Sequence, residues 1–70
     1  MKEKFSENIK HLVNESDLNA VEISKEVGVH NAMIYHYMNG VHEPTISVFK
    51  KLCRVLRCRY EDILGDVNED

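Results

Sequence analysis

The stretch LNAVEISKEVGVHNAMIYHYMNGVHEP, residues 18–44, contains the signals that decide the fold. Asn19, with Glu22 three positions later, has the spacing of a capping box, in which each residue satisfies a backbone N–H of the other. A helix is therefore predicted to begin there. It must be short, because Gly28 follows it and glycine readily takes the positive φ that ends a helix. Gly40 repeats this stop signal twelve positions later.

A second short helix is predicted between the two glycines, over residues 31–39. Ile34, Tyr37 and Met38 lie on one face of it. Tyr35 lies about 200° from Tyr37 around a helix, so one tyrosine is expected in the core and the other at the surface. Two short helices joined by a tight glycine turn cross steeply, which lets the second one project from the body of the protein.

Apolar residues recur at helical spacing on both sides of this stretch. Before it they predict one amphipathic helix, followed by a turn at NESD, residues 14–17. After it Thr45 can cap a fourth helix, and residues 60–64 predict a last short helix with Ile63 and Leu64 inward. Strand-like alternation is missing from the sequence, so we expect an all-α fold of five short helices. The inward positions of the first and fourth helices are Phe5, Ile9, Leu12, Val13, Val48, Phe49, Leu52, Cys53 and Leu56.

This arrangement resembles the lambda-repressor-like DNA-binding domains, also called the Cro/CI or XRE family. The resemblance covers about residues 5–64. It implies a compact five-helix domain, residues 1–65, with a central helix-turn-helix and a short acidic tail, residues 66–70. The segment VFKKLCRVLRCRYEDIL continues the match, and the shared marks before it are Asn19, Ile23, Ser24, Val27, Gly28, Val29, Ile34, Tyr37, Asn39, Gly40 and Pro44.

In such a motif the N-terminal part of the projecting helix enters the major groove of double-stranded DNA. The outward residues of the helix over 31–39 are therefore predicted to contact the bases. Asn31 can pair bidentately with adenine, and Ala32 can meet a thymine methyl group. Tyr35 and His36 can hydrogen-bond base edges or phosphates.

The resemblance also implies phosphate contacts around this helix, among them backbone N–H groups at the start of the preceding helix. Many family members have a DNA-contacting glutamine where Ala20 stands here. Many also pair an arginine and a glutamate at the positions of Val13 and Met38, an ion pair that apolar packing can replace. The implied phosphate contacts are Asn19, Ala20, His30, Asn39, His42 and Lys50.

The net charge of −3 argues mildly against a nucleic-acid binder. The distribution of charge softens that argument, because three of the 12 acids lie in the last five residues. Without them nine acids face nine Lys and Arg. Residues 44–60 carry five Lys and Arg and no acid. This basic segment can attract DNA, although a run of this kind is often only a solvated helix face.

The histidines and cysteines do not have the spacing of a metal or redox site. His30, His36 and His42 recur every six residues, whereas a metal pair on a helix needs a spacing of three or four. Cys53 and Cys58 lie five apart, which suits neither a CxxC pair nor a disulfide framework. We expect two reduced cysteines, at least one of them packed in the core.

Other classes of protein find little support in the sequence. It has no nucleophile–base constellation and no glycine-rich phosphate loop, so enzymatic activity, a cofactor, a bound metal and a small-molecule ligand are not expected. No apolar run approaches the ~20 residues of a membrane span. The first residues lack the apolar core of a signal peptide, so a cytoplasmic location is predicted.

We therefore predict a sequence-specific transcriptional regulator of the repressor type that binds a palindromic operator as a homodimer. By resemblance, Tyr60, Ile63 and Leu64 supply the apolar part of the dimer surface. The alternative is a protein-interaction module that keeps the helix-turn-helix fold without operator binding. The acidic balance and Ala20 favour the module, whereas Asn31, Asn39 and the basic fourth helix favour DNA.

Overall fold

The computed structural model describes residues 2–65, with side chains from residue 4 onward. The acidic tail predicted over 66–70 lies outside the described residues. Within 2–65 the chain has no strand, and the predicted all-α fold is confirmed. Its five helices are α1 (Lys2–Glu15), α2 (Ala20–Val27), α3 (Asn31–Met38), α4 (Ile46–Leu56) and α5 (Tyr60–Leu64).

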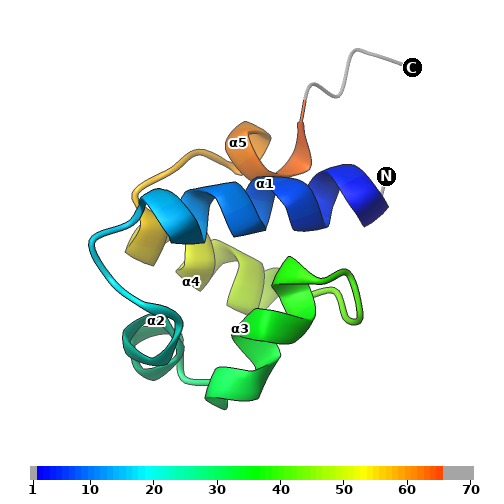
Figure 1. The fold of residues 1–70 in the computed structure, drawn as a ribbon. Helices are drawn as coiled ribbons and strands as arrows, with labels where there is room; N and C mark the ends of the chain where they lie inside the picture. Colours follow the sequence, from blue (N-terminus) through cyan, green and yellow to red (C-terminus); the bar gives the residue numbers. More distant parts are fainter. Residues whose placement is uncertain (1, 66–70) are drawn as a thin grey trace.

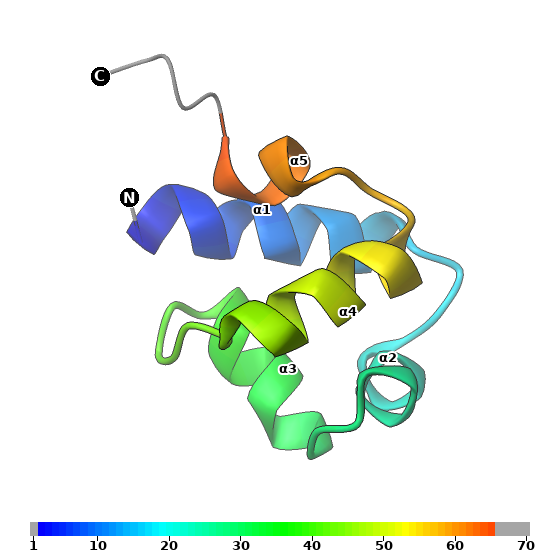
Figure 2. The same ribbon diagram turned by 180° about the vertical axis from the view of Figure 1, so that it is seen from behind.

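The long helix α1 runs across the middle of the molecule (Figures 1 and 2). It contacts α5 on one side and α3 on the other, while α2 contacts both α3 and α4. The helix-turn-helix pair α2–α3 therefore lies at the end of the molecule opposite α5. A hydrogen bond of 2.9 Å from Asn8 Nδ2 to the carbonyl oxygen of Ile63 ties α1 to α5.

The helices α2 and α4 begin where the sequence predicts, because their predicted N-caps are present. Asn19 Oδ1 accepts a hydrogen bond from the Glu22 N–H at 2.8 Å, and the Asn19 N–H donates to Glu22 Oε1 at 2.9 Å. Thr45 Oγ1 accepts from the Val48 N–H at 3.3 Å at the start of α4. These bonds satisfy donors that a helix N-terminus otherwise leaves unpaired.

Both predicted glycine stops are confirmed. Gly28 has φ 89° and ψ 31°, the left-handed conformation, and turns the chain from α2 into α3. Gly40 has φ 75°, and the next N–H, of Val41, donates to the His36 carbonyl oxygen at 2.9 Å. This second pattern is a Schellman motif, which pairs the last carbonyls of α3.

The end of α4 is a Schellman motif without a glycine. Arg57 takes the left-handed conformation with φ 56° and ψ 47°. Its N–H donates to the Arg54 carbonyl oxygen at 3.3 Å, and the Cys58 N–H donates to the Cys53 carbonyl oxygen at 3.0 Å. A side chain in this conformation carries a steric cost that glycine avoids, so α4 ends under local strain.

One residue of each helix is fully buried at the centre of the core: Ile9, Ile23, Ile34, Leu52 and Ile63.

Three boundary or burial predictions need correction. The helix α1 continues through Asn14 and Glu15, where a turn was expected. Asn39 caps α3 and is not its last residue. Leu64, predicted inward, is exposed, because α5 is one turn long and buries only its Ile63.

Candidate nucleic-acid interface

The two faces of α3 separate as the periodicity predicts. Tyr37 is 3% exposed and Ile34 is fully buried, whereas Tyr35 is 49% exposed. Burial also raises the pKa of Tyr37, so its phenol stays neutral. Asn31 and Ala32, the other predicted base readers in the first turn, are half-buried. The free face of α3 therefore presents short or neutral polar groups.

The N-terminus of α3 is capped by a histidine. His30 Nδ1 accepts a hydrogen bond from the Ala32 N–H at 3.1 Å, and the His30 residue is exposed. An accepting Nδ1 carries no proton, so the neutral ring bears its N–H on Nε2. The predicted phosphate contact of His30 then has a donor available, held in place by the cap.

The N-terminus of α2 lies beside the same helix. One hollow is lined in part by Asn19, Ala20 and Tyr35, so three predicted contacts from two helices come together. The capping box uses Asn19 Oδ1, which leaves Asn19 Nδ2 to face a ligand. Ala20 is buried, and only its backbone N–H can serve a phosphate. The Glu22 carboxylate at the cap adds an unfavourable charge for an anion there.

A second pair of predicted contacts forms at the other end of α3. The rings of His36 and His42 lie 5.2 Å apart, because the Schellman turn at Gly40 brings the loop back over the helix. His36 is half-buried, and its Nδ1 is buried without a hydrogen-bond partner. Only the other ring nitrogen of His36 remains for a base edge. His42 and Asn39 are exposed.

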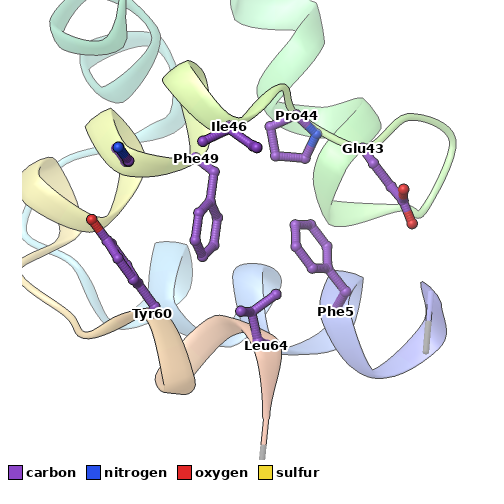
Figure 3. Close-up of a pocket in the computed structure, with 8 residues that line it drawn as sticks. Phe5, Glu43, Pro44, Ile46, Phe49, Tyr60 and Leu64 are labelled. Carbon is purple, nitrogen blue, oxygen red and sulfur yellow. The ribbon is translucent and has the colours of Figure 1, made fainter. Parts of the chain in front are cut away.

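Lys50 does not join either group. It is exposed on α4 and lines a different hollow, which opens between α1, α4 and α5 (Figure 3). The other cations of the basic segment, Lys51, Arg54, Arg57 and Arg59, are also exposed, so this charge is available to solvent. The main basic surface therefore lies on and after α4, and the polar contacts around α3 contain no Lys or Arg.

The predicted dimer residues divide in the same way. Ile63 is 0% exposed, so its place on the dimer surface is wrong: it packs in the core under α1. Tyr60 and Leu64 are exposed and line the groove of Figure 3, which has a volume of about 480 Å³. We call this hollow the α4–α5 groove. Its lining residues are Phe5, Glu43, Pro44, Ile46, Phe49, Lys50, Tyr60 and Leu64.

The sequence did not indicate Ile46 as a surface residue, nor Phe5, which is half-buried, as a lining residue of the groove. Ile46 is 75% exposed at the start of α4. The ring of Phe5 lies 6.3 Å from that of Phe49, which lies 5.3 Å from that of Tyr60, so three aromatic rings form one wall. An isoleucine just after a helix cap and outside the inward set of α4 was a signal that was available.

Comparison with known families decides the classification. A family model described as helix-turn-helix matches residues 9–63. The chain belongs to this helix-turn-helix family, of the XRE type. The predicted family is therefore confirmed, and members of this class are DNA-binding regulators of transcription.

The fold also matches a solved structure. The solution structure of the SOS-response transcriptional repressor LexA from Eubacterium rectale superimposes with a TM-score of 0.84 at 23% identity, covering 99% of this chain and 73% of that chain. At this identity the likeness supports the five-helix architecture alone. No curated protein sequence matches the chain. In the described part of the chain, no helix is long and apolar enough to cross a membrane.

Proposed function

We propose that this helix-turn-helix protein recognises a specific operator in double-stranded DNA through the free face of α3. The observation that carries this proposal is the hollow shared by Asn19, Ala20 and Tyr35. It sets the N-terminus of α2, which can hold a phosphate, directly beside an exposed side chain of α3. The group that would hold the DNA backbone and the side chain that would read a base then lie next to each other.

The proposed roles follow the chemistry of each group. Asn31 pairs with an adenine, Ala32 contacts a thymine methyl group, and Tyr35 and His36 reach base edges with a hydroxyl and one ring nitrogen. Neutral contacts of this kind specify sequence but release few counterions. The phosphate contacts are Asn19, the Ala20 backbone, His30, Asn39, His42 and Lys50.

We further propose that the protein binds as a homodimer and that the two copies meet at the apolar residues of the α4–α5 groove, with Lys50 left to contact DNA. The longest dimension of one copy is 34 Å, about one turn of DNA, so a single copy reaches only one half-site. Ile46, Tyr60 and Leu64 supply exposed apolar surface around the groove. A two-fold pairing of this surface gives a palindromic operator.

We infer a repressor role, since a dimer that covers an operator competes with other proteins for the same DNA. The resemblance to the lambda-repressor-like domains supports this role. The structural neighbour LexA, a repressor by its name, has the same fold.

The test is selection of duplexes from a random pool at stated salt, followed by titration of the selected operator. Asn31→Ala is expected to relax the preference at one base position, with a loss of ~1–3 kcal/mol there. Lys50→Ala is expected to weaken operator and random duplexes equally and to flatten the salt dependence by roughly one unit. Lys10→Ala removes one exposed cation of α1 and serves as the charge-matched control.

A protein-interaction module is the second candidate. Glu22 at the α2 cap and the missing glutamine at Ala20 both favour it. It predicts that selection enriches no common sequence, and that Asn31→Ala and Lys10→Ala leave the weak DNA affinity equally unchanged. That outcome would refute operator binding by α3.

A further inference from the structure

The two cysteines form a contact that DNA binding does not use. They occupy the two positions of the α4 Schellman motif whose side chains usually make an apolar contact. Here the two thiols are hydrogen-bonded to each other, and neither cysteine forms a disulfide. The 3.0 Å backbone bond from Cys58 to Cys53 holds the pair together from the main chain as well.

The pair is open from one side. Cys53 is buried, whereas Cys58 is half-buried and lines a surface hollow of about 290 Å³ with Arg59, Tyr60 and Glu61. A small reagent can therefore approach Cys58 from solvent, and its hydrogen-bond partner Cys53 lies on the buried side of it.

We propose that Cys53 and Cys58 form a dithiol site that binds a neutral trivalent arsenical by bridging the two sulfur atoms. An aryl arsenic(III) dihydroxide has two hydroxyl groups to exchange. Two S–As bonds form, two As–O and two S–H bonds break, and the two protons leave with the hydroxyls as two water molecules. Arsenic stays trivalent, so no oxidant or reductant is needed, and the site remains uncharged.

The environment of the pair favours this reaction over two others. Burial raises the pKa of both thiols. That of Cys58 reaches about 12 with smaller contributions from Cys53 and Asp62, whereas the hydrogen bond with Cys58 partly offsets the rise in the pKa of Cys53. Oxidation by a peroxide starts from a thiolate, which is scarce here. Zinc needs thiolates and usually four ligands, and residues 4–65 contain no group of three side chains able to hold a metal ion.

The experiment uses the full chain, reduced, with phenylarsine oxide as the probe. We expect one arsenic per chain by native mass spectrometry, loss of both titratable thiols, a rise in Tm, and reversal by a competing small dithiol. The rise in Tm is expected because the fold already holds the two thiols together, whereas the unfolded chain must close a loop before it can bind the same arsenic. Zinc chloride in place of the arsenical is expected to leave Tm unchanged.

Two variants separate chelation from simple thiol reactivity. Cys58→Ser keeps a hydrogen-bonding group and is expected to lose affinity on the order of 100-fold, the advantage of a second linked contact. The double variant Lys10→Cys, Cys58→Ser keeps two cysteines per chain but separates them, and it is expected to bind as weakly as Cys58→Ser. Two arsenicals per chain, or equal affinity in all three proteins, would overturn the proposal.

Discussion

The Nδ1 atom of His30 accepts a hydrogen bond from the backbone N–H of Ala32 at 3.1 Å, so one side chain both caps α3 and stands where a phosphate contact is proposed. These two roles separate in a pair of variants. His30→Ala is expected to destabilise the fold by about 1 kcal/mol through loss of the cap, whereas His30→Ser keeps a capping oxygen and recovers most of that loss.

Both His30 variants are expected to weaken DNA binding to a similar extent, because both lose the Nε2 donor. Thermal melts and operator titrations on the same samples check the two effects. If His30→Ser restores DNA affinity together with stability, the ring acts only as a cap.

Gly28 offers a test of backbone strain without a steric clash. A Cβ at this position would meet no atom within 4 Å, yet φ is +89°. Gly28→Ala should therefore cost ~1–2 kcal/mol from the left-handed conformation alone. Gly28→Asn should cost less, because asparagine tolerates this region. Urea unfolding measures both, and equal stability of parent and Gly28→Ala would contradict the turn.

At Arg57 a substitution to glycine is expected to raise the free energy of unfolding, the opposite of the effect at Gly28. It is the only non-glycine residue with positive φ within 2–65. Arg57→Gly should stabilise the protein by up to about 1 kcal/mol, because relief of the strain exceeds the extra freedom of glycine in the unfolded chain. Arg57→Ala removes the same charge and keeps the strain, so it serves as the control. A gain of equal size in both variants would assign the effect to charge.

The raised thiol pKa values predict a loss of stability in alkali. Cys58 has a folded-state pKa of about 12 against an ordinary value of 9.0. Below about pH 9 the thiol is protonated in both states, and stability is fully present. Between pH 9 and 12 the unfolded thiol ionises first, so unfolding becomes easier as pH rises. Urea midpoints from pH 7 to 10.5 should fall less steeply in Cys58→Ser than in the parent, and parallel slopes would contradict the assignment.

The proposed dimer predicts a role for Ile46. This side chain is 75% exposed, so Ile46→Lys should leave the free energy of unfolding within about 0.5 kcal/mol of the parent. At the α4–α5 groove it should shift the dimer toward monomer and weaken operator binding. Sedimentation measures the first effect. Ser47→Lys, an exposed position next to it, is the matched control, and an equal shift in both would count against the groove.

Local signals predicted the helices well, since caps and stops act within four or five residues. Asn19, Thr45 and Gly28 each perform the role that their side chain or its absence allows. Ile63 shows the limit of this reasoning. The sequence shows that Ile63 is an apolar residue on one face of a helix. Whether α1 or a second copy of the chain covers it depends on contacts between residues 55 positions apart. A core residue and a dimer residue look alike in the sequence.

The way in which the candidate residues group in space was not predictable from the sequence. His36 and His42 lie six apart, and their contact depends on how the chain turns after α3. The contact between the two cysteines depends on Arg57 adopting the left-handed conformation, which arginine rarely takes. The sequence therefore does not predict this contact.

The first turns of α1 contact both the α4–α5 groove, where the dimer is proposed to form, and the end of α3, the proposed reading helix. Phe5 lines the α4–α5 groove, and the next residue, Ser6, lies against Gly40 at the end of α3, where an added Cβ would come within 3.4 Å of Ser6 Oγ. In the proposed dimer, the path from the contact between copies to the reading helix thus crosses a single peptide bond. Because this path is so short, the packing of Phe5 is expected to set the distance between the two reading helices of the dimer. A change that repacks Phe5 would alter the distance between the two reading helices, and with it the number of base pairs accepted between half-sites, while leaving the bases read within each half-site unchanged.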